Sequence, residues 1–138
     1  ENSRLQLGGR DNVVVDTLRL LTGRLLSAFG RRRHALSTRT ATIGIRGTGV
    51  YAEAEPDLSY ICTCYGTTEV ASSARPDTAE TVTATHHAAR YVTADAVRTA
   101  PFINHTDEEL ELIEALVGRT PPFLIGDEAY DTPRRQDY

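Results

Sequence analysis

Two cysteines and three histidines in the second half of the sequence have the types and spacing of a metal site: Cys62, Cys64, His86, His87 and His105. Thiolate sulfur and imidazole nitrogen are the usual protein ligands of zinc and of several other transition metals. Residues two apart on a β-strand point to the same face, so the two thiols are expected side by side. Their Cα atoms would then stand about 6–7 Å apart, which one ion with metal–sulfur bonds of about 2.3 Å can bridge.

Two other states of Cys62 and Cys64 compete with metal binding. A disulfide normally has a Cα separation of about 5.5–6 Å and a strict dihedral angle, so a ring closed across one extended residue bends the strand or stores strain. An oxidising compartment nevertheless favours that bond. Alternatively, the cysteines stay free and pack as small hydrophobic side chains.

The histidines would complete the site from other segments. His86 and His87 are adjacent, so on a strand they face opposite sides and only one joins the cysteines; the sequence does not say which. His105 stands directly before a predicted helix start, where a fixed backbone would hold its ring toward the sheet. Two sulfurs and two nitrogens suit zinc or copper, so one of these two metals is the predicted cofactor. A [2Fe-2S] cluster with mixed ligands is the alternative.

Short strands are the elements that must position these side chains. Segments rich in Val, Ile, Leu, Thr and Tyr alternate with Gly, Pro-Asp and Asp-Asn breaks, which is typical of strands and turns. The predicted strands are Arg4–Leu7, Asn12–Leu20, Arg24–Phe29, Thr40–Ile45, Val50–Glu55, Leu58–Tyr65, Thr67–Ser72, Glu80–Thr85 and Arg90–Thr93. We therefore expect a mainly β fold, a β-sandwich or β-roll of short strands with one C-terminal α-helix.

That helix is predicted over 107–117. Thr106 and Glu109 form a capping box at its start, and Gly118 supplies a left-handed stop. An apolar stripe is expected to pack on the sheet; it comprises Leu110, Ile113, Leu116 and Val117. Favourable charge at the helix start and a solvated face account for the acidic residues Asp107, Glu108, Glu109, Glu111 and Glu114.

Composition narrows the classes of protein. With 138 residues, 40% of them hydrophobic, and a formal charge of −4, the chain suits one globular domain and gives no nucleic-acid footprint. We expect residues 1–118 to form the domain and 119–138 an extended, Pro-containing tail. No apolar run approaches the roughly 20 residues of a membrane span. The absence of Met suggests a mature form or a fragment of a longer precursor.

A segment in the first half carries a resemblance to a known family. Residues 38–49 read Thr-Arg-Thr-Ala-Thr-Ile-Gly-Ile-Arg-Gly-Thr-Gly and resemble the FecR domain, a β-rich periplasmic module, with Arg39 in place of the customary Pro. Residues 17–29 look like the strand pair that precedes this motif, and the likeness covers residues 3–72. It implies a location in the periplasm or cell envelope, another envelope protein as a possible partner, and further strands upstream of residue 1.

Arg46 is the unusual member of that motif. Its guanidinium is expected to pair with Glu53 or Glu55, or alternatively to bind a ligand.

The sequence thus predicts a metal-binding envelope domain, structural or electron-carrying, with a site of two cysteines and two histidines. The alternative is a FecR-like binding, assembly or signalling module whose cysteines form a disulfide. No Ser-His-Asp arrangement, phosphate loop or metalloprotease motif is recognisable, so an enzyme is not expected.

Overall fold

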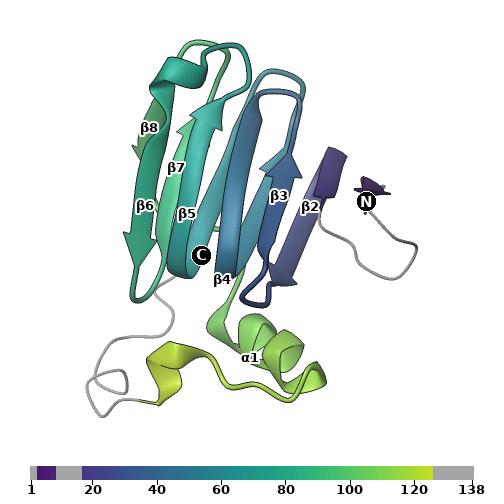
Figure 1. Cartoon of the computed structure of the whole chain (residues 1–138), viewed down its shortest axis with the longest axis vertical. Coiled ribbons are helices and arrows are strands. Elements are labelled where there is room, and N and C mark those ends of the chain that lie inside the picture. Colours follow the sequence, from purple (N-terminus) through teal and green to yellow (C-terminus); the bar gives the residue numbers. More distant parts are fainter. Residues whose placement is uncertain (1–2, 9–16, 126–138) are drawn as a thin grey trace.

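A computed structural model describes residues 3–8 and 17–125 of the chain. These residues form eight strands, one α-helix and two short 3-10 helices (Figure 1). In chain order they are β1 (Arg4–Gly8), β2 (Thr17–Ala28), β3 (Arg33–Ser37), β4 (Ala41–Ala54), β5 (Ser59–Ser72), η1 (Pro76–Thr78), β6 (Glu80–Ala84), β7 (Ala88–Val92), β8 (Val97–Ala100), α1 (Asp107–Leu116) and η2 (Pro122–Leu124). The predicted mainly β class with one helix near the C-terminus is confirmed.

The strands form one mixed sheet in the order β1-β2-β3-β4-β5-β7-β8, with β6 also paired to β5 and β2 also paired to β4. β2 and β3 are parallel, and the other neighbours are antiparallel. The two longest strands, β4 and β5, change partners along their length. The first part of β4 pairs with β3 and the second with β2, while the first part of β5 pairs with β7 and the second with β6.

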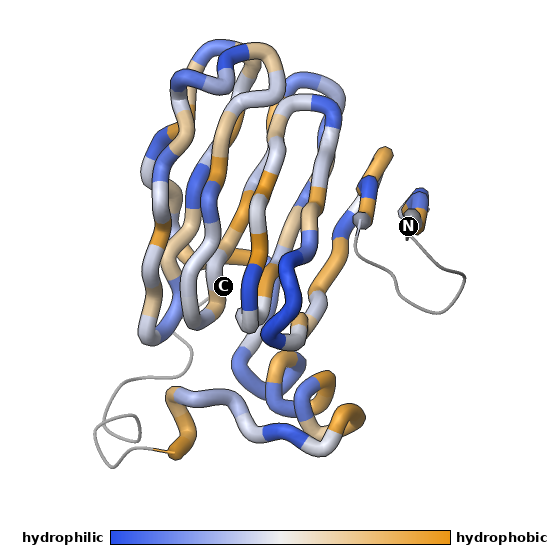
Figure 2. The backbone as a smooth tube through the Cα atoms, in the orientation of Figure 1, coloured by the Kyte–Doolittle hydropathy of each residue, from blue (hydrophilic) through white to orange (hydrophobic). Residues whose placement is uncertain are grey.

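β4 and β5 bend where these partners change. Gly47 and Gly66 have φ angles of 61° and 82°, which a side chain would disfavour, and the β4–β5 register shifts on both sides of Gly49. The two parts of the sheet therefore fold over a shared core. Ile43 and Val50, from opposite sides of the bend, belong to the same buried cluster. Figure 2 shows hydrophobic and hydrophilic positions alternating along the strands that enclose it.

A second, smaller core contains two of the predicted metal ligands, Cys62 and Cys64. Its buried members are Tyr51, Tyr60, Cys62, Cys64, Tyr65, Ala89, Leu110 and Phe123. Strands β4, β5 and β7 supply the first six of these residues, while α1 and η2 supply Leu110 and Phe123. Figure 1 places α1 beyond the ends of the strands, and residues 101–125 thus cover this cluster.

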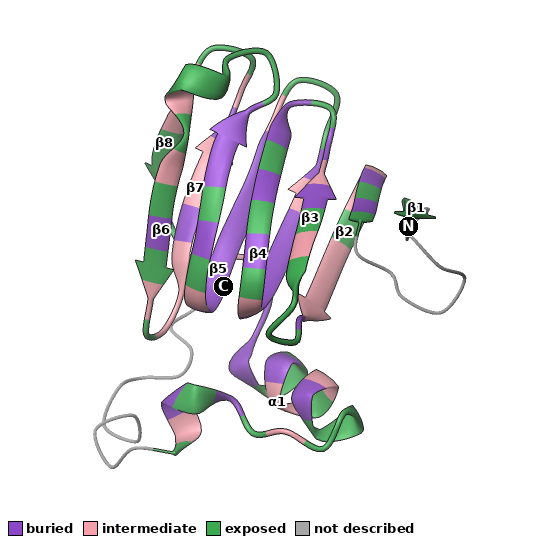
Figure 3. Ribbon diagram, viewed as in Figure 1, coloured by how far each residue is buried: buried purple, intermediate pink, exposed green. Residues whose placement is uncertain are grey.

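The helix begins and ends as predicted, but the residues on its buried face differ from those predicted. The Thr106–Glu109 capping box is present, and Gly118 adopts φ 70° after the last turn. The side facing the sheet carries Asp107, Leu110 and Glu114, whereas Leu116 and Val117 are 79% and 60% exposed. The prediction that the full apolar stripe packs on the sheet is therefore wrong, because two carboxylates with partners occupy that face. Figure 3 shows buried and exposed residues alternating along α1.

Several predicted strand ends are also wrong. The segments Thr40–Ile45 and Val50–Glu55 are parts of β4, and Leu58–Tyr65 and Thr67–Ser72 are parts of β5. Glycines between them bend each strand without ending it.

Two strands were not predicted. β3 begins at the last of three consecutive arginines, Arg33, and β8 has only Val97 as a large apolar residue. Of the predicted strand Asn12–Leu20, residues 12–16 lie outside the described part. So do residues 126–138 of the predicted tail, while Phe123 before them is buried.

Candidate metal centre

Cys62 and Cys64 project together from β5. Both thiols are free, fully buried and part of the second core, as strand alternation predicts. A β-bulge lies at this point: Val50 pairs with Thr63 and Gly49 with Tyr65, so Cys64 has no counterpart on β4. A bulge turns side chains from their regular directions and frees backbone groups. Here the freed Cys64 carbonyl accepts a hydrogen bond of 2.8 Å from the amide of His87.

That hydrogen bond fixes His87 in the turn between β6 and β7. The residue has φ 53°, in the left-handed region, and its ring stacks on Phe102 with centroids 3.7 Å apart. Its Nδ1 lies 3.5 Å from Cys62 Sγ, and its Nε2 lies 2.6 Å from Asp107 Oδ1. The turn thus presents one ring nitrogen to the cysteines and the other to a carboxylate.

His86 takes a different position. The prediction that the two histidines face opposite sides of a strand is wrong, because both lie in the turn and both rings reach Asp107. The Nε2 of His86 is 2.8 Å from Asp107 Oδ2, and the residue is not among the four that converge on the sulfurs. The structure therefore separates the pair: His87 lies at the cysteines, and His86 supports the carboxylate.

His105 reaches the cysteines from the segment before α1. Asn104, with φ 65°, turns the backbone, and Tyr51 stacks on the His105 ring with centroids 4.2 Å apart. Its Nε2 lies 3.6 Å from Cys64 Sγ, while its Nδ1 lies 2.8 Å from the carbonyl oxygen of Ile103. The side chain is almost fully buried, so these contacts fix its direction.

The four donor atoms have the spacing of one coordination sphere. The sulfurs of Cys62 and Cys64 and one nitrogen each of His87 and His105 all lie within 4.8 Å of one another. Tetrahedral zinc, with bonds of about 2.3 Å to sulfur and 2.0–2.1 Å to nitrogen, sets a sulfur–nitrogen edge of roughly 3.5 Å. The observed 3.5 and 3.6 Å match that edge.

The outer hydrogen bonds leave one nitrogen of each imidazole facing the sulfurs. A carbonyl oxygen only accepts, so Nδ1 of His105 must donate to Ile103 and Nε2 carries the lone pair. An ionised carboxylate also only accepts, so Nε2 of His87 donates to Asp107 and Nδ1 is the nitrogen that faces Cys62. Burial lowers the pKa of His87, but its hydrogen bonds to Asp107 and Cys62 outweigh burial and raise it, so a metal ion at Nδ1 competes with a proton. Such outer hydrogen bonds orient ligand histidines in metalloproteins.

Asp107 is the functional residue that the sequence interpretation missed. It was assigned to the helix start and a solvated face, yet it is fully buried and contacts both His86 and His87. Burial raises the pKa of this carboxyl, but the hydrogen bonds from the two histidines outweigh burial and lower it, so the group is ionised. Its place at the first helical position, two residues after His105, was the available signal.

The two thiols differ in acidity. Burial raises the pKa of Cys62, but its hydrogen-bond contacts with Cys64, His105 and His87 outweigh burial and bring that pKa well below its usual range. Burial and the hydrogen bond to Cys62 hold the pKa of Cys64 well above its usual range. Binding a metal to both sulfurs therefore displaces the proton of the Cys64 thiol.

Two tyrosines, Tyr51 and Tyr60, line the site and hold the covering segment, residues 101–125. The Tyr60 hydroxyl donates to the carbonyl of Pro101 at 2.7 Å and accepts from the amide of Ile103 at 3.1 Å. The Tyr51 hydroxyl donates to Glu53 at 2.6 Å, and the same carboxylate accepts from Asn104 at 2.7 Å. Both residues on which His105 depends, Ile103 and Asn104, are therefore held by the sheet.

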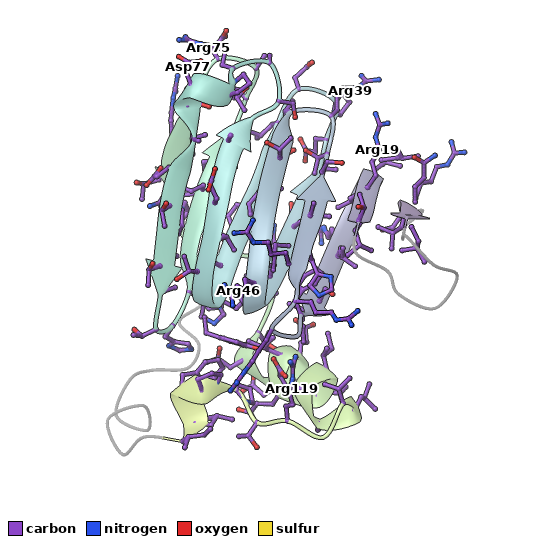
Figure 4. All side chains as sticks on the ribbon, in the orientation of Figure 1. Arg19, Arg39, Arg46, Arg75, Asp77 and Arg119 are labelled. Atoms are coloured by element: carbon purple, nitrogen blue, oxygen red, sulfur yellow. The ribbon has the colours of Figure 1, made fainter. Side chains whose placement is uncertain are left out.

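Arg46 lies away from this centre. The expected pairing with Glu53 or Glu55 is not seen among the described residues, where Glu53 contacts Tyr51, Asn104 and Arg24. Arg46 is exposed on β4, on the outer face of the sheet (Figure 4). Within the described residues, no helix has the length and apolar character that crossing a membrane requires.

Comparison with known proteins supports the fold but not a family. No family model matches the chain, and no curated protein matches it. Solved structures do match, two of them of a "putative anti-sigma factor" from Parabacteroides distasonis ATCC 8503. The first is 13% identical with a TM-score of 0.55 and covers 80% of this chain and 51% of its own. The second is 14% identical with a TM-score of 0.50 and covers 71% and 46%. The chain thus spans about half the length of these structures.

Proposed function

We propose that this chain is a metal-binding domain of the bacterial cell envelope, in which Cys62, Cys64, His87 and His105 hold one zinc ion. The observation that carries the proposal is the convergence of two buried sulfurs with two imidazole nitrogens, while the other nitrogen of each ring is held by an outer acceptor. Closed tetrahedral sites of two sulfurs and two nitrogens are typical of structural zinc. Monovalent copper is the second choice, since it also favours soft sulfur ligands.

The spacing favours a single ion over an iron–sulfur cluster. In a [2Fe-2S] cluster with mixed ligands, the cysteines bind one iron and the histidines the other, so sulfur and nitrogen do not share an ion. Here each sulfur has an imidazole nitrogen at 3.5 or 3.6 Å, the edge length of one tetrahedron. All four positions are also filled by protein side chains, which suits a structural role better than a catalytic one.

The role we propose for the ion is to fasten residues 101–125 to the sheet. Among the large apolar side chains of this segment, only Leu110 and Phe123 are buried, contributing about 1.5–3 kcal/mol each. Ordering the backbone costs roughly 1–2 kcal/mol per residue, so this apolar contact alone is small against the cost. A ligand from the segment, His105, bound to an ion on β5 adds to the hydrogen bonds that already attach the segment to Tyr60 and Glu53.

The arrangement around Cys62 also resembles the catalytic site of a thiol enzyme. Cys62, His87 and Asp107 stand in the order nucleophile, base and orienting acid. Both cysteines are fully buried, however, and His105 and Cys64 occupy the space beside the Cys62 sulfur. A substrate has no approach to this sulfur, so the arrangement favours a closed metal site.

A regulatory module is the second candidate function. It is favoured by the fold shared with structures described as a "putative anti-sigma factor" and by the resemblance of residues 38–49 to the FecR domain, which also suggests a periplasmic location. In this reading the ion stabilises a domain that contacts another envelope protein. Transcript profiles of a strain lacking the protein would then change for genes of one alternative sigma factor, and unchanged profiles would count against it.

Metal content measured on the purified chain tests the zinc proposal. Native mass spectrometry and elemental analysis should find one ion per chain, and cobalt substitution should give the visible bands of a tetrahedral sulfur–nitrogen site. Cys62→Ser should abolish binding, whereas His34→Gln, a histidine outside the centre, should leave it intact. A chain that binds no ion with both thiols free, or that contains a native disulfide, would overturn the proposal.

A further inference from the structure

A groove on the outer face of the sheet is separate from the metal centre. It runs over the part of the sheet built from β3, β4, β5 and β6, has a volume of about 370 Å³ and is lined by Arg33, Gly44, Arg46, Thr67, Glu69 and Thr81 among others. These six residues are all exposed. The cysteines lie on the other part of β5, before the bend at Gly66.

Two arginines meet at one end of this groove. Arg33 and Arg46 are direct partners in the β3–β4 register, and like charges in that position destabilise a sheet. Neither guanidinium has an ion pair among the described residues. By contrast, Arg75, Arg90 and Arg119 each pair with a carboxylate. The chain thus keeps two adjacent cations without a counter-charge, although its net charge is −4.

Small residues leave the floor of the groove open. Next to the arginines, the β3–β4–β5 register aligns Ala35, Gly44 and Glu69 across the sheet. A Cβ atom built on Gly44 would make an ordinary contact of 3.7 Å with Glu69 Cβ, so the backbone does not require glycine here. The missing side chain therefore creates space on the sheet without relieving strain.

The donors at the arginine end fit a phosphate better than a carboxylate. One guanidinium satisfies both oxygens of a carboxylate, whereas a tetrahedral phosphate has further oxygens for a second guanidinium. Thr67 is opposite Arg46 in the β4–β5 register, and its hydroxyl lies 3.1 Å from that of Thr83, so it can donate to a ligand while it accepts from Thr83. Glu69 beyond it has no ion pair among the described residues and would attract an ammonium or hydroxyl group.

We propose that this groove binds a phosphate-bearing ligand, with the phosphate between Arg33 and Arg46 and a hydrogen-bond donor of the same ligand toward Glu69. Phosphoethanolamine has this chemistry, either as a free compound or as a lipid headgroup. The groove has no residue in common with the metal centre, so the ligand proposal and the zinc proposal can be tested independently.

Titration calorimetry with phosphoethanolamine and with inorganic phosphate tests the site on the metal-loaded chain. Phosphoethanolamine should bind more tightly than phosphate, and Glu69→Gln should remove the difference. The double variant R33Q/R46Q should bind phosphoethanolamine roughly tenfold more weakly or worse. Gly44→Val, which fills the floor, should also weaken binding while leaving both charges in place.

A charge-matched variant and vesicles complete the design. R39Q/R98Q removes two exposed arginines outside the groove and should bind as the wild type does. Sedimentation with phosphatidylethanolamine vesicles, against phosphatidylcholine vesicles, shows whether the headgroup in a membrane is accepted as well as the free compound. Absence of binding to both forms, or equal losses in R33Q/R46Q and R39Q/R98Q, would overturn the proposal.

Discussion

The carboxylate of Asp107 lies 2.6 Å from the Nε2 of His87 and fixes which nitrogen of that ring faces Cys62. The contact joins the first residue of α1 to the turn between β6 and β7. It therefore links the orientation of a proposed metal ligand to the docking of the helix.

Asp107→Asn should weaken zinc binding. The amide keeps the shape of the side chain but loses the negative charge that makes His87 a stronger ligand, and loss of such an outer partner costs about 10–100-fold in affinity. Competition with a chromophoric chelator measures the change. Glu108→Gln is the matched control, since Glu108 is an exposed acid in the same helical turn. Equal affinities of D107N and the wild type would show that the carboxylate does not tune the ligand.

The adjacent histidines should respond differently to substitution. His87→Ala removes a donor at 3.5 Å from Cys62 Sγ, so the chain should no longer retain one ion per molecule. His86→Ala removes a partner of Asp107 and a ring contact with Phe123 but no donor atom at the sulfurs, so the stoichiometry should stay at one ion while the affinity falls less than in H87A. Native mass spectrometry of the two variants distinguishes them. Loss of the ion from H86A with retention in H87A would contradict the assignment.

Much of this centre follows from the sequence, and the remainder depends on contacts that the sequence does not show. Strand alternation places Cys62 and Cys64 on one face, and the capping box of Thr106 and Glu109 fixes the helix start after His105. The choice between His86 and His87 depends on the left-handed turn and on the Cys64 carbonyl freed by a bulge.

Asp107 shows the same limit in another way. An acid at a helix start is normally explained by helix electrostatics, and only the fold shows that two histidines meet it. The predicted strands that are joined in β4 and in β5 show this limit as well. Glycine is a turn signal in a sequence, but Gly47 and Gly66 bend two long strands whose ladders continue on both sides.

Zinc removal should loosen the covering segment before the main core. Chelation deprives His105 of its bond to the sheet, so amides in 101–125 should exchange faster with deuterated solvent. Amides of β4 around Ile43 belong to the core between the two parts of the sheet and should keep their protection. Mass-detected hydrogen exchange of the loaded and chelated chain measures both regions. Uniform loss of protection would indicate global unfolding, and no change in 101–125 would contradict the fastening role.

Gly49→Ala should destabilise the chain by disturbing the contact between β4 and α1. A Cβ atom at this position would lie 2.9 Å from Tyr65 Cε1 and 3.0 Å from Leu110 Cδ1, closer than packed carbons allow. Overpacking of this kind costs about 1–3 kcal/mol, and urea unfolding measures the change in the free energy of unfolding.

Gly44→Ala is the matched control on the same strand, because its Cβ would meet Glu69 Cβ at 3.7 Å. This control should be neutral or stabilising by up to about 1 kcal/mol, since glycine in a strand carries an entropic penalty. Because Leu110 packs beside the proposed centre, G49A should also weaken zinc binding while G44A leaves it unchanged. Equal stabilities of the two variants would show that α1 can shift away from β4 at no cost.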